Sequence, residues 1–171
     1  MKVSKNKILA CLNEIAEEVT HNINYVNSGG CAVFSIMLAD VLNSLNISDY
    51  EFKVFSWDNS HDVSVVENGI IFGVNNIENW YECNVDFSHV MLRYGKYIID
   101  SNGVVSYKPN MEWDGYSLHK GAISYHTIKE LAKIPRNWNE VFARTDIPKM
   151  RRIVKSITKK HFGVDVKPFS K

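Results

Sequence analysis

The stretch Asn27-Ser28-Gly29-Gly30-Cys31-Ala32-Val33-Phe34-Ser35-Ile36-Met37-Leu38 joins a polar loop with paired glycines to a strongly apolar segment. The apolar residues continue to Leu45 and cover nearly every side of a helix, so the sequence predicts a buried helix that begins at or just before Cys31. A rigid, buried helix is a suitable mount for a reactive side chain. The loop therefore delivers one cysteine to the start of a central helix, and the rest of the chain is interpreted around it.

The position of Cys31 suits a nucleophile. The first backbone N–H groups of a helix lack intrahelical partners, and the helix dipole places partial positive charge beside the sulfur, which favours the thiolate. Gly29 and Gly30 allow positive φ and close approach of a substrate, and the N–H of Cys31 is expected to point at a developing oxyanion. The alternative is a small buried hydrophobic residue after an ordinary turn, which is the commoner role of a single cysteine.

A candidate base lies downstream, where two short strand-like runs flank Gly95-Lys96. A two-residue turn there predicts a β-hairpin. The predicted pairs are Tyr94 with Tyr97, Leu92 with Ile99, Met91 with Asp100, and His89 with Asn102. Because side chains alternate between the faces of a sheet, His89 and Asp100 share a face as diagonal neighbours, about 7 Å apart at the backbone. Asn102 is the second candidate for orienting His89. The alternative is a surface hairpin whose histidine and aspartate face solvent.

Together these residues resemble a known family. The order is cysteine at the start of a long apolar helix, then histidine on a strand, then aspartate on the next strand, which is similar to the transglutaminase-like branch of the papain-like cysteine proteases. The resemblance runs from about Asn27 to Asn102 and includes an extended segment at 51–57, where that family places the strand after its central helix. The Gly29-Gly30 pair is also similar to arylamine N-acetyltransferases. The chain lacks the Asp-Cys-Ser-Gly stretch typical of the cell-wall peptidase branch.

The resemblance implies an α+β, papain-like fold in which the N-terminal central helix carrying the cysteine packs on an antiparallel sheet. It implies Cys31 as nucleophile, His89 as general base and acid, and Asp100 as the orienter of His89. The implied reaction is hydrolysis or acyl transfer at a peptide, isopeptide or amide bond of a peptide or protein substrate, through a thioester. Water as acceptor makes a protease or amidase, and an amine makes a transferase. The papain-type oxyanion glutamine is missing, and Asn27 or Asn24 is its candidate substitute.

Further candidates surround this constellation. Gly29 and Gly30 would border the substrate, and Trp80, in the polar segment 75–87, would line a cleft, although core anchoring is the commoner role of an aromatic residue. Cys83 with Cys31 and His89 does not match zinc sites, in which paired ligands usually lie about two to four residues apart. The sequence therefore predicts neither a metal nor a cofactor.

Composition favours one globular domain over residues 1–171. With 171 residues, 45% of them hydrophobic, the chain is long enough for one well-packed core. The net charge of +1 gives no global reason to bind nucleic acid or a membrane surface. No apolar run approaches a signal-peptide core or a membrane span. Three cysteines at irregular spacing argue against a disulfide framework, so a reducing, cytoplasmic compartment is expected. The oligomeric state stays open.

Two terminal helices complete the prediction. Apolar residues at helical spacing predict an amphipathic helix over about residues 4–22, with Cys11 near its apolar stripe as inert core. A basic helix is expected at about 147–161. Its cations are Lys149, Arg151, Arg152, Lys155 and Lys159.

The basic helix has two interpretations. We favour a packed helix with a solvated face, because no aromatic or base-reading pattern accompanies the charge. The alternative is a surface for nucleic acid or another anionic partner. A third hypothesis for the whole chain is a catalytically inactive papain-like binding module, in which Cys31 and His89 lie far apart or the cleft is blocked.

Overall fold

A computed structural model describes residues 3–24, 26, 30–56, 87–113, 116–118, 125, 128 and 146–167. Over these residues the helices are α1 (Lys5–Asn22), α2 (Cys31–Ser44) and α7 (Ile147–Phe162). The longer strands are β1 (Glu51–Ser56), β2 (Phe87–Tyr94), β3 (Tyr97–Asp100) and β4 (Gly103–Ser106). Two short strands, β5 (Glu112–Trp113) and β6 (Tyr116–Leu118), extend the same antiparallel sheet in the order β4-β3-β2-β1-β6-β5. The described residues therefore form an α+β fold, as predicted.

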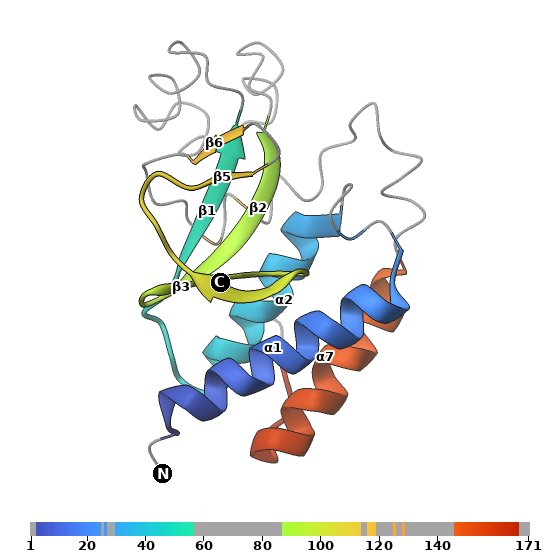
Figure 1. The fold of residues 1–171 in the computed structure, drawn as a ribbon. Coiled ribbons are helices and arrows are strands. Elements are labelled where there is room, and N and C mark those ends of the chain that lie inside the picture. Colours follow the sequence, from blue (N-terminus) through green and yellow to red (C-terminus); the bar gives the residue numbers. More distant parts are fainter. Residues whose placement is uncertain are drawn as a thin grey trace.

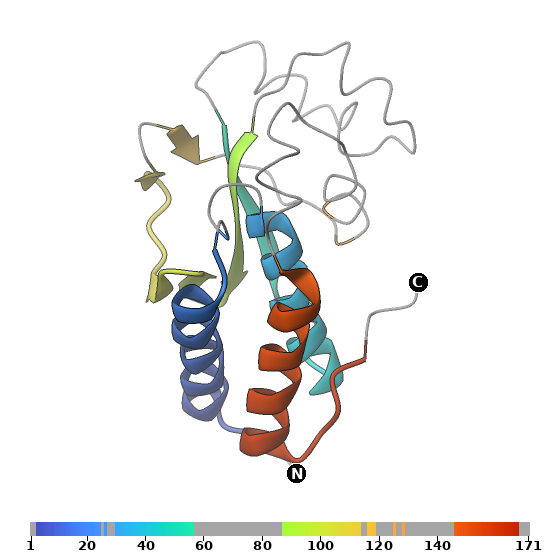
Figure 2. The same ribbon diagram turned by 90° about the vertical axis from the view of Figure 1, so that its right-hand side faces the viewer.

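The helices form two layers beside the sheet (Figure 1). Helix α1 packs against β3 and β4, and α2 packs against β2 and β3. Helix α7 packs against α1 and α2 and forms the outer layer (Figure 2). The main core lies where these elements meet, and burial of each of its large side chains contributes about 2 kcal/mol. Its largest fully buried members include Ile8, Leu12, Phe34, Leu38, Phe52, Leu92 and Ile99.

Helix α1 has the predicted boundaries and the predicted buried face. Ser4 caps it by accepting a hydrogen bond from the N–H of Lys7. The apolar positions expected to face the core are buried: Ile8, Leu12, Ile15, Ala16 and Val19. Cys11 is buried as well, and burial raises the pKa of its thiol to about 12, so it stays protonated at neutral pH. The prediction that Cys11 belongs to the core is confirmed.

Helix α2 begins at Cys31, as predicted. Gly30 is its N-cap residue, with φ −90° and ψ −8°. This is ordinary right-handed backbone, so Gly30 does not use the positive φ that a glycine allows. What Gly30 contributes is the lack of a capping side chain, which leaves the first N–H groups of α2 without a cap from this residue. Asn27 and Gly29 lie outside the described residues.

The β2–β3 hairpin has the predicted turn and register. Gly95 adopts φ +60°, Tyr94 pairs with Tyr97, and the ladder includes the predicted Leu92–Ile99 pair. Strand β3 ends at Asp100, however, and Asn102 lies in the turn to β4. The predicted pairing of His89 with Asn102 is therefore wrong, because the chain turns away after Asp100 and does not continue alongside β2.

Strand β1 matches the predicted extended segment and lies beside β2. Their ladder contains a register shift, in which Phe55 pairs with His89 but Ser56 pairs with Phe87. Ser88 is thus an extra residue on β2. Such a β-bulge bends the strand and redirects neighbouring side chains. The bulge adjoins His89, so it helps to set the direction of this side chain.

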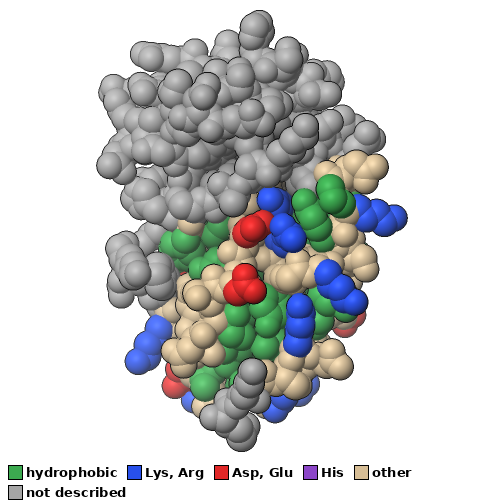
Figure 3. Space-filling model, turned by 90° about the vertical axis from the view of Figure 1, so that its left-hand side faces the viewer, with side chains coloured by type: hydrophobic (Ala, Val, Ile, Leu, Met, Phe, Trp, Pro, Cys, Tyr) green, Lys and Arg blue, Asp and Glu red, His purple; other side chains and the backbone are tan. Residues whose placement is uncertain are grey.

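A second, smaller hydrophobic cluster contains Met91 and Ile98. Nearby, Glu51 forms ion pairs with Lys53 on the same strand and with Arg93 on the neighbouring strand β2. Figure 3 shows the side of the molecule away from α7, where hydrophobic side chains lie among charged side chains of both signs. No helix among the described residues is long and apolar enough to cross a membrane.

Helix α7 confirms the predicted basic C-terminal helix. Asp146 caps it by accepting a hydrogen bond of 2.8 Å from the N–H of Lys149. Gly163 ends it with φ +69°, in the left-handed region. The apolar residues Met150, Val154 and Ile157 are buried. Most of the predicted cations are exposed on the other side: Arg151, Arg152, Lys155 and Lys159.

Gly103 is expected to be sensitive to substitution. It adopts φ +110°, and an added Cβ would lie 3.0 Å from Oδ1 of Asn13 in α1. We expect Gly103→Ala to lower the free energy of unfolding by about 2 kcal/mol, because backbone strain and a close contact coincide. Gly163→Ala is the control: its φ is +69° with open space around it, and about 1 kcal/mol is expected. Urea unfolding measures both, and equal losses would contradict a role for the Asn13 contact.

Candidate functional site

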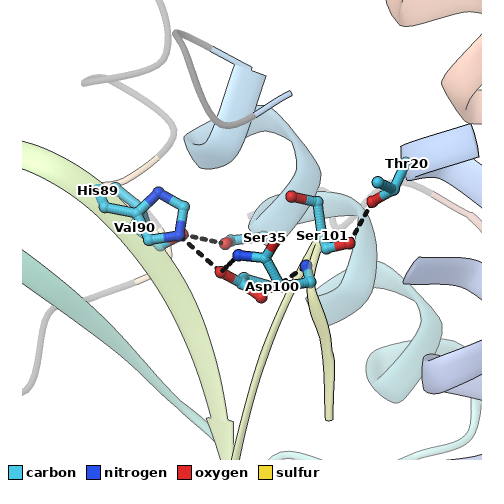
Figure 4. A network of polar contacts seen from close by, with 7 residues as sticks. Thr20, Ser35, His89, Val90, Asp100 and Ser101 are labelled. Atoms are coloured by element: carbon cyan, nitrogen blue, oxygen red, sulfur yellow. Dashed lines mark hydrogen bonds and ion pairs between the residues drawn. The ribbon is translucent and has the colours of Figure 1, made fainter. Parts of the chain in front are cut away.

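The structure brings His89 and Asp100 together. Nε2 of His89 lies 2.9 Å from Oδ2 of Asp100 (Figure 4). Both residues are buried, with 0% and 5% of their surface exposed. A carboxylate can only accept hydrogen bonds, so Nε2 carries the proton and donates it to Asp100. The other ring nitrogen, Nδ1, is consequently the one available for proton exchange. The diagonal proximity inferred from the hairpin register is confirmed, and a catalytic role for the pair stays a prediction.

Asn102 holds the far side of Asp100. Its backbone N–H donates to Oδ1 at 2.8 Å, and its side-chain amide donates to Oδ2 at 3.1 Å. Oδ2 therefore accepts from both His89 and Asn102. These bonds orient the carboxylate and lower the cost of burying its charge. Asn102 was expected across the hairpin as an alternative orienter of His89. Asn102 instead orients Asp100, which in turn bonds His89.

Cys31 interacts with the same imidazole. Burial alone would lower the pKa of His89, but hydrogen bonds with Asp100 and with Cys31, and the negative charges of both, outweigh burial and raise this pKa to about 9. The imidazole therefore keeps its second proton at neutral pH. The protonated ring and the N-terminal end of α2 both place positive charge beside Cys31. This arrangement can hold a thiolate–imidazolium pair.

Helix α2 is tied to β2 by a buried hydrogen bond next to this pair. The hydroxyl of Ser35 donates to the carbonyl oxygen of Val90 at 3.1 Å (Figure 4). Ser35 lies one helical turn after Cys31, and Val90 follows His89 in the chain. The bond therefore joins the two elements that carry the cysteine and the histidine.

Helix α1 holds the turn that follows Asp100. The hydroxyl of Thr20 donates to the carbonyl oxygen of Ser101 (Figure 4), and Oδ1 of Asn13 accepts from the N–H of Val104 at 3.2 Å. These bonds hold both ends of the β3–β4 turn against α1. The position of Asp100 thus depends on a helix near the start of the chain.

Of the remaining predicted site residues, the structure describes Gly30 and Asn24. Gly30 directly precedes Cys31 and is buried. Asn24 is exposed in the turn after α1. The proposed oxyanion residue Asn27, and the substrate-lining candidates Gly29 and Trp80, lie outside the described residues.

Sequence patterns had not indicated Ser35 or Thr20. Ser35 has a weak signature, since it is a hydroxyl residue inside an otherwise apolar helix, one turn after the cysteine. Thr20 lies at the end of an amphipathic helix, where a polar residue is unremarkable. Among the described residues, no group of three histidine, cysteine, aspartate or glutamate side chains lies close enough together to hold a metal ion.

No protein-family model, curated protein or solved structure matches this chain. The chemistry is therefore inferred from the geometry. A cysteine at the start of a helix, an imidazole beside it and a carboxylate behind the imidazole are the groups that nucleophilic acyl transfer requires.

The raised pKa of His89 predicts how stability depends on pH. The interactions of protonated His89 contribute to the free energy of unfolding. This contribution is complete below the ordinary histidine pKa of 6.5 and is lost as pH rises through about 9. Asp100→Asn removes the carboxylate, so the stability difference from wild type should be largest at about pH 6 and should shrink by about pH 10. Urea unfolding at both pH values measures it.

Asp165→Asn is the control for the pH experiment. Asp165 forms an exposed ion pair with Lys159, so its loss should cost little and show no comparable trend with pH over this range. A stability difference for Asp100→Asn that stays constant from about pH 6 to about pH 10 would contradict a raised pKa at His89.

Proposed function

We propose that this protein is a cysteine-dependent hydrolase or acyltransferase that acts on a peptide, isopeptide or amide bond through Cys31, His89 and Asp100. The observation that carries the proposal is the buried His89 imidazole, which is bonded through Nε2 to Asp100 and interacts with Cys31. The α+β architecture, with Cys31 opening a buried helix beside an antiparallel sheet, supports a papain-like, transglutaminase-like classification. A cytoplasmic location and a peptide or protein substrate belong to the same proposal.

The proposed mechanism uses the two ring nitrogens differently. His89 holds the proton taken from the Cys31 thiol, and the thiolate attacks the carbonyl carbon of the substrate. The backbone N–H of Cys31, at the start of α2, stabilises the oxyanion, with Asn27 as a candidate second donor. His89 then protonates the leaving amine as the C–N bond breaks, and a thioester remains. Throughout these steps Asp100 keeps Nε2 protonated and the ring in place.

The second half of the reaction decides the class of enzyme. Neutral His89 accepts a proton from the incoming nucleophile, which attacks the thioester, and the Cys31 sulfur leaves as the thiolate. Water as nucleophile gives a carboxylic acid and makes a protease or amidase. An amine gives a new amide and makes a transferase. The same three residues can support attack by either water or an amine.

The contacts of the described residues favour this proposal over its alternatives. An inactive binding module in which cysteine and histidine lie apart is disfavoured, because Cys31 is close enough to His89 to raise the pKa of its imidazole. The basic face of α7 is partly engaged within the chain, since Lys149 donates to the carbonyl of Asn22 and Lys159 pairs with Asp165. These contacts favour a solvated helix face over a surface for nucleic acid.

The first test measures the reactivity of Cys31. We expect iodoacetamide to alkylate Cys31 at about pH 6 at least tenfold faster than a free thiol with a pKa of about 8.5, because protonated His89 interacts with the sulfur. His89→Ala should remove this advantage, and Asp100→Ala should reduce it less. Mass spectrometry of the modified peptides gives the rate at each cysteine.

Cys11 is the internal control for alkylation. Its thiol is buried with a raised pKa, so it should react slowly in every folded variant. Cys31→Ala should leave stability within about 1 kcal/mol of wild type and abolish turnover of any amide or peptide substrate found in a screen. Slow alkylation of Cys31, indistinguishable from that of Cys11, would sink the proposed mechanism.

A further inference from the structure

We propose that Ser35 is a positioning residue that sets the distance between Cys31 and His89; this inference rests on the proposed function. Ser35 is completely buried, and its hydroxyl donates to the carbonyl oxygen of Val90 at 3.1 Å. The residue is neither a nucleophile nor a base in the mechanism. Its role is to fix the helix that carries the nucleophile against the strand that carries the base.

The geometry of α2 connects Ser35 to Cys31. Residues four apart on a helix lie on the same face, about 6 Å apart along the axis. Cys31 and Ser35 therefore share the face of α2 that is turned toward β2. On the strand, His89 and Val90 are consecutive. The bond between Ser35 and Val90 (Figure 4) thus constrains the neighbouring contact between Cys31 and His89.

Hydrophobic packing alone would leave this distance loosely defined. The buried side chains of α2 are almost all apolar, including Phe34, Met37, Leu38, Val41 and Leu42. Burial of apolar surface is non-directional, so it holds a helix on a sheet without specifying its position along the axis closely. A hydrogen bond is directional and weakens steeply when its geometry is lost. The Ser35 hydroxyl therefore supplies an axial constraint that its apolar neighbours do not.

The position of the bond along β2 supports a role at the site. The β2–β3 ladder pairs Leu92 with Ile99, and the Val90 carbonyl lies two residues further toward His89. The bulge at Ser88 adjoins His89 on its other side. The Ser35 bond therefore joins α2 to β2 at Val90, which pairs with Val54 of β1 and lies one residue from His89, close to the bulge.

The test compares the pH profile of Cys31 alkylation among variants. Ser35→Ala removes the hydroxyl, and we expect about tenfold slower labelling of Cys31 at about pH 6, with the profile moved toward that of a free thiol. Ser35→Thr keeps a hydroxyl and should restore the rate to within about threefold of wild type. Iodoacetamide labelling with mass spectrometry is read for Cys31 alone.

Thr158→Val is the matched control. The Thr158 hydroxyl is also completely buried and donates to a backbone carbonyl, that of Val154 at 2.7 Å, but it lies in the outer helix α7. Its loss should lower the urea unfolding midpoint about as much as Ser35→Ala does and leave the Cys31 profile unchanged. Should Ser35→Ala fail to fold, Ser35→Cys, with similar volume and a weaker donor, provides the same comparison.

The outcomes separate this inference from the proposed function. An activated wild-type Cys31 whose profile is unchanged by Ser35→Ala would overturn the positioning role and leave the mechanism standing. A wild-type Cys31 that already reacts like a free thiol would overturn both. An equal shift of the Cys31 profile in Thr158→Val would show that general destabilisation causes the effect, and would also overturn the role of Ser35.

Discussion

The hydrogen bond between His89 and Asp100 is the interaction on which the described structure around the site depends. A buried carboxylate and a buried imidazole are costly to remove from water unless each is bonded well. Asn102 satisfies the carboxylate from the turn, and the bond to His89 spans from β3 to β2. Each helix next to the sheet adds a hydroxyl contact nearby, from Ser35 and from Thr20. Ser35 and Asp100, two of the buried polar side chains, therefore lie near this one ring.

Much of this arrangement could be predicted from local patterns. Helical spacing of apolar residues identified α1, α2 and α7, because each buries one side or nearly all of its surface. The Gly95-Lys96 turn set the hairpin register, and strand alternation then placed His89 near Asp100. These inferences succeeded because each depends on residues close together in the sequence.

The remaining features depend on contacts that leave no local pattern. The Ser35–Val90 bond joins residues 55 positions apart, and the Thr20–Ser101 bond joins residues 81 positions apart. The predicted position of Asn102 was wrong because strand β3 ends at Asp100. The Asp100 carboxylate accepts the N–H of Asn102, and the chain turns there. The proposed papain-like classification rests on residue order and on the α+β architecture.

Because α1 holds the turn after Asp100, the proposed site around Cys31 can form only late in folding. Thr20 is translated long before Ser101, so the turn cannot be anchored until the hairpin has been made and has docked on the first helix. Until then, Cys31 on a nascent or unfolded chain is an ordinary alkyl thiol with no imidazole beside it. In the proposed mechanism, the reactivity of Cys31 therefore arises only after the tertiary structure has formed.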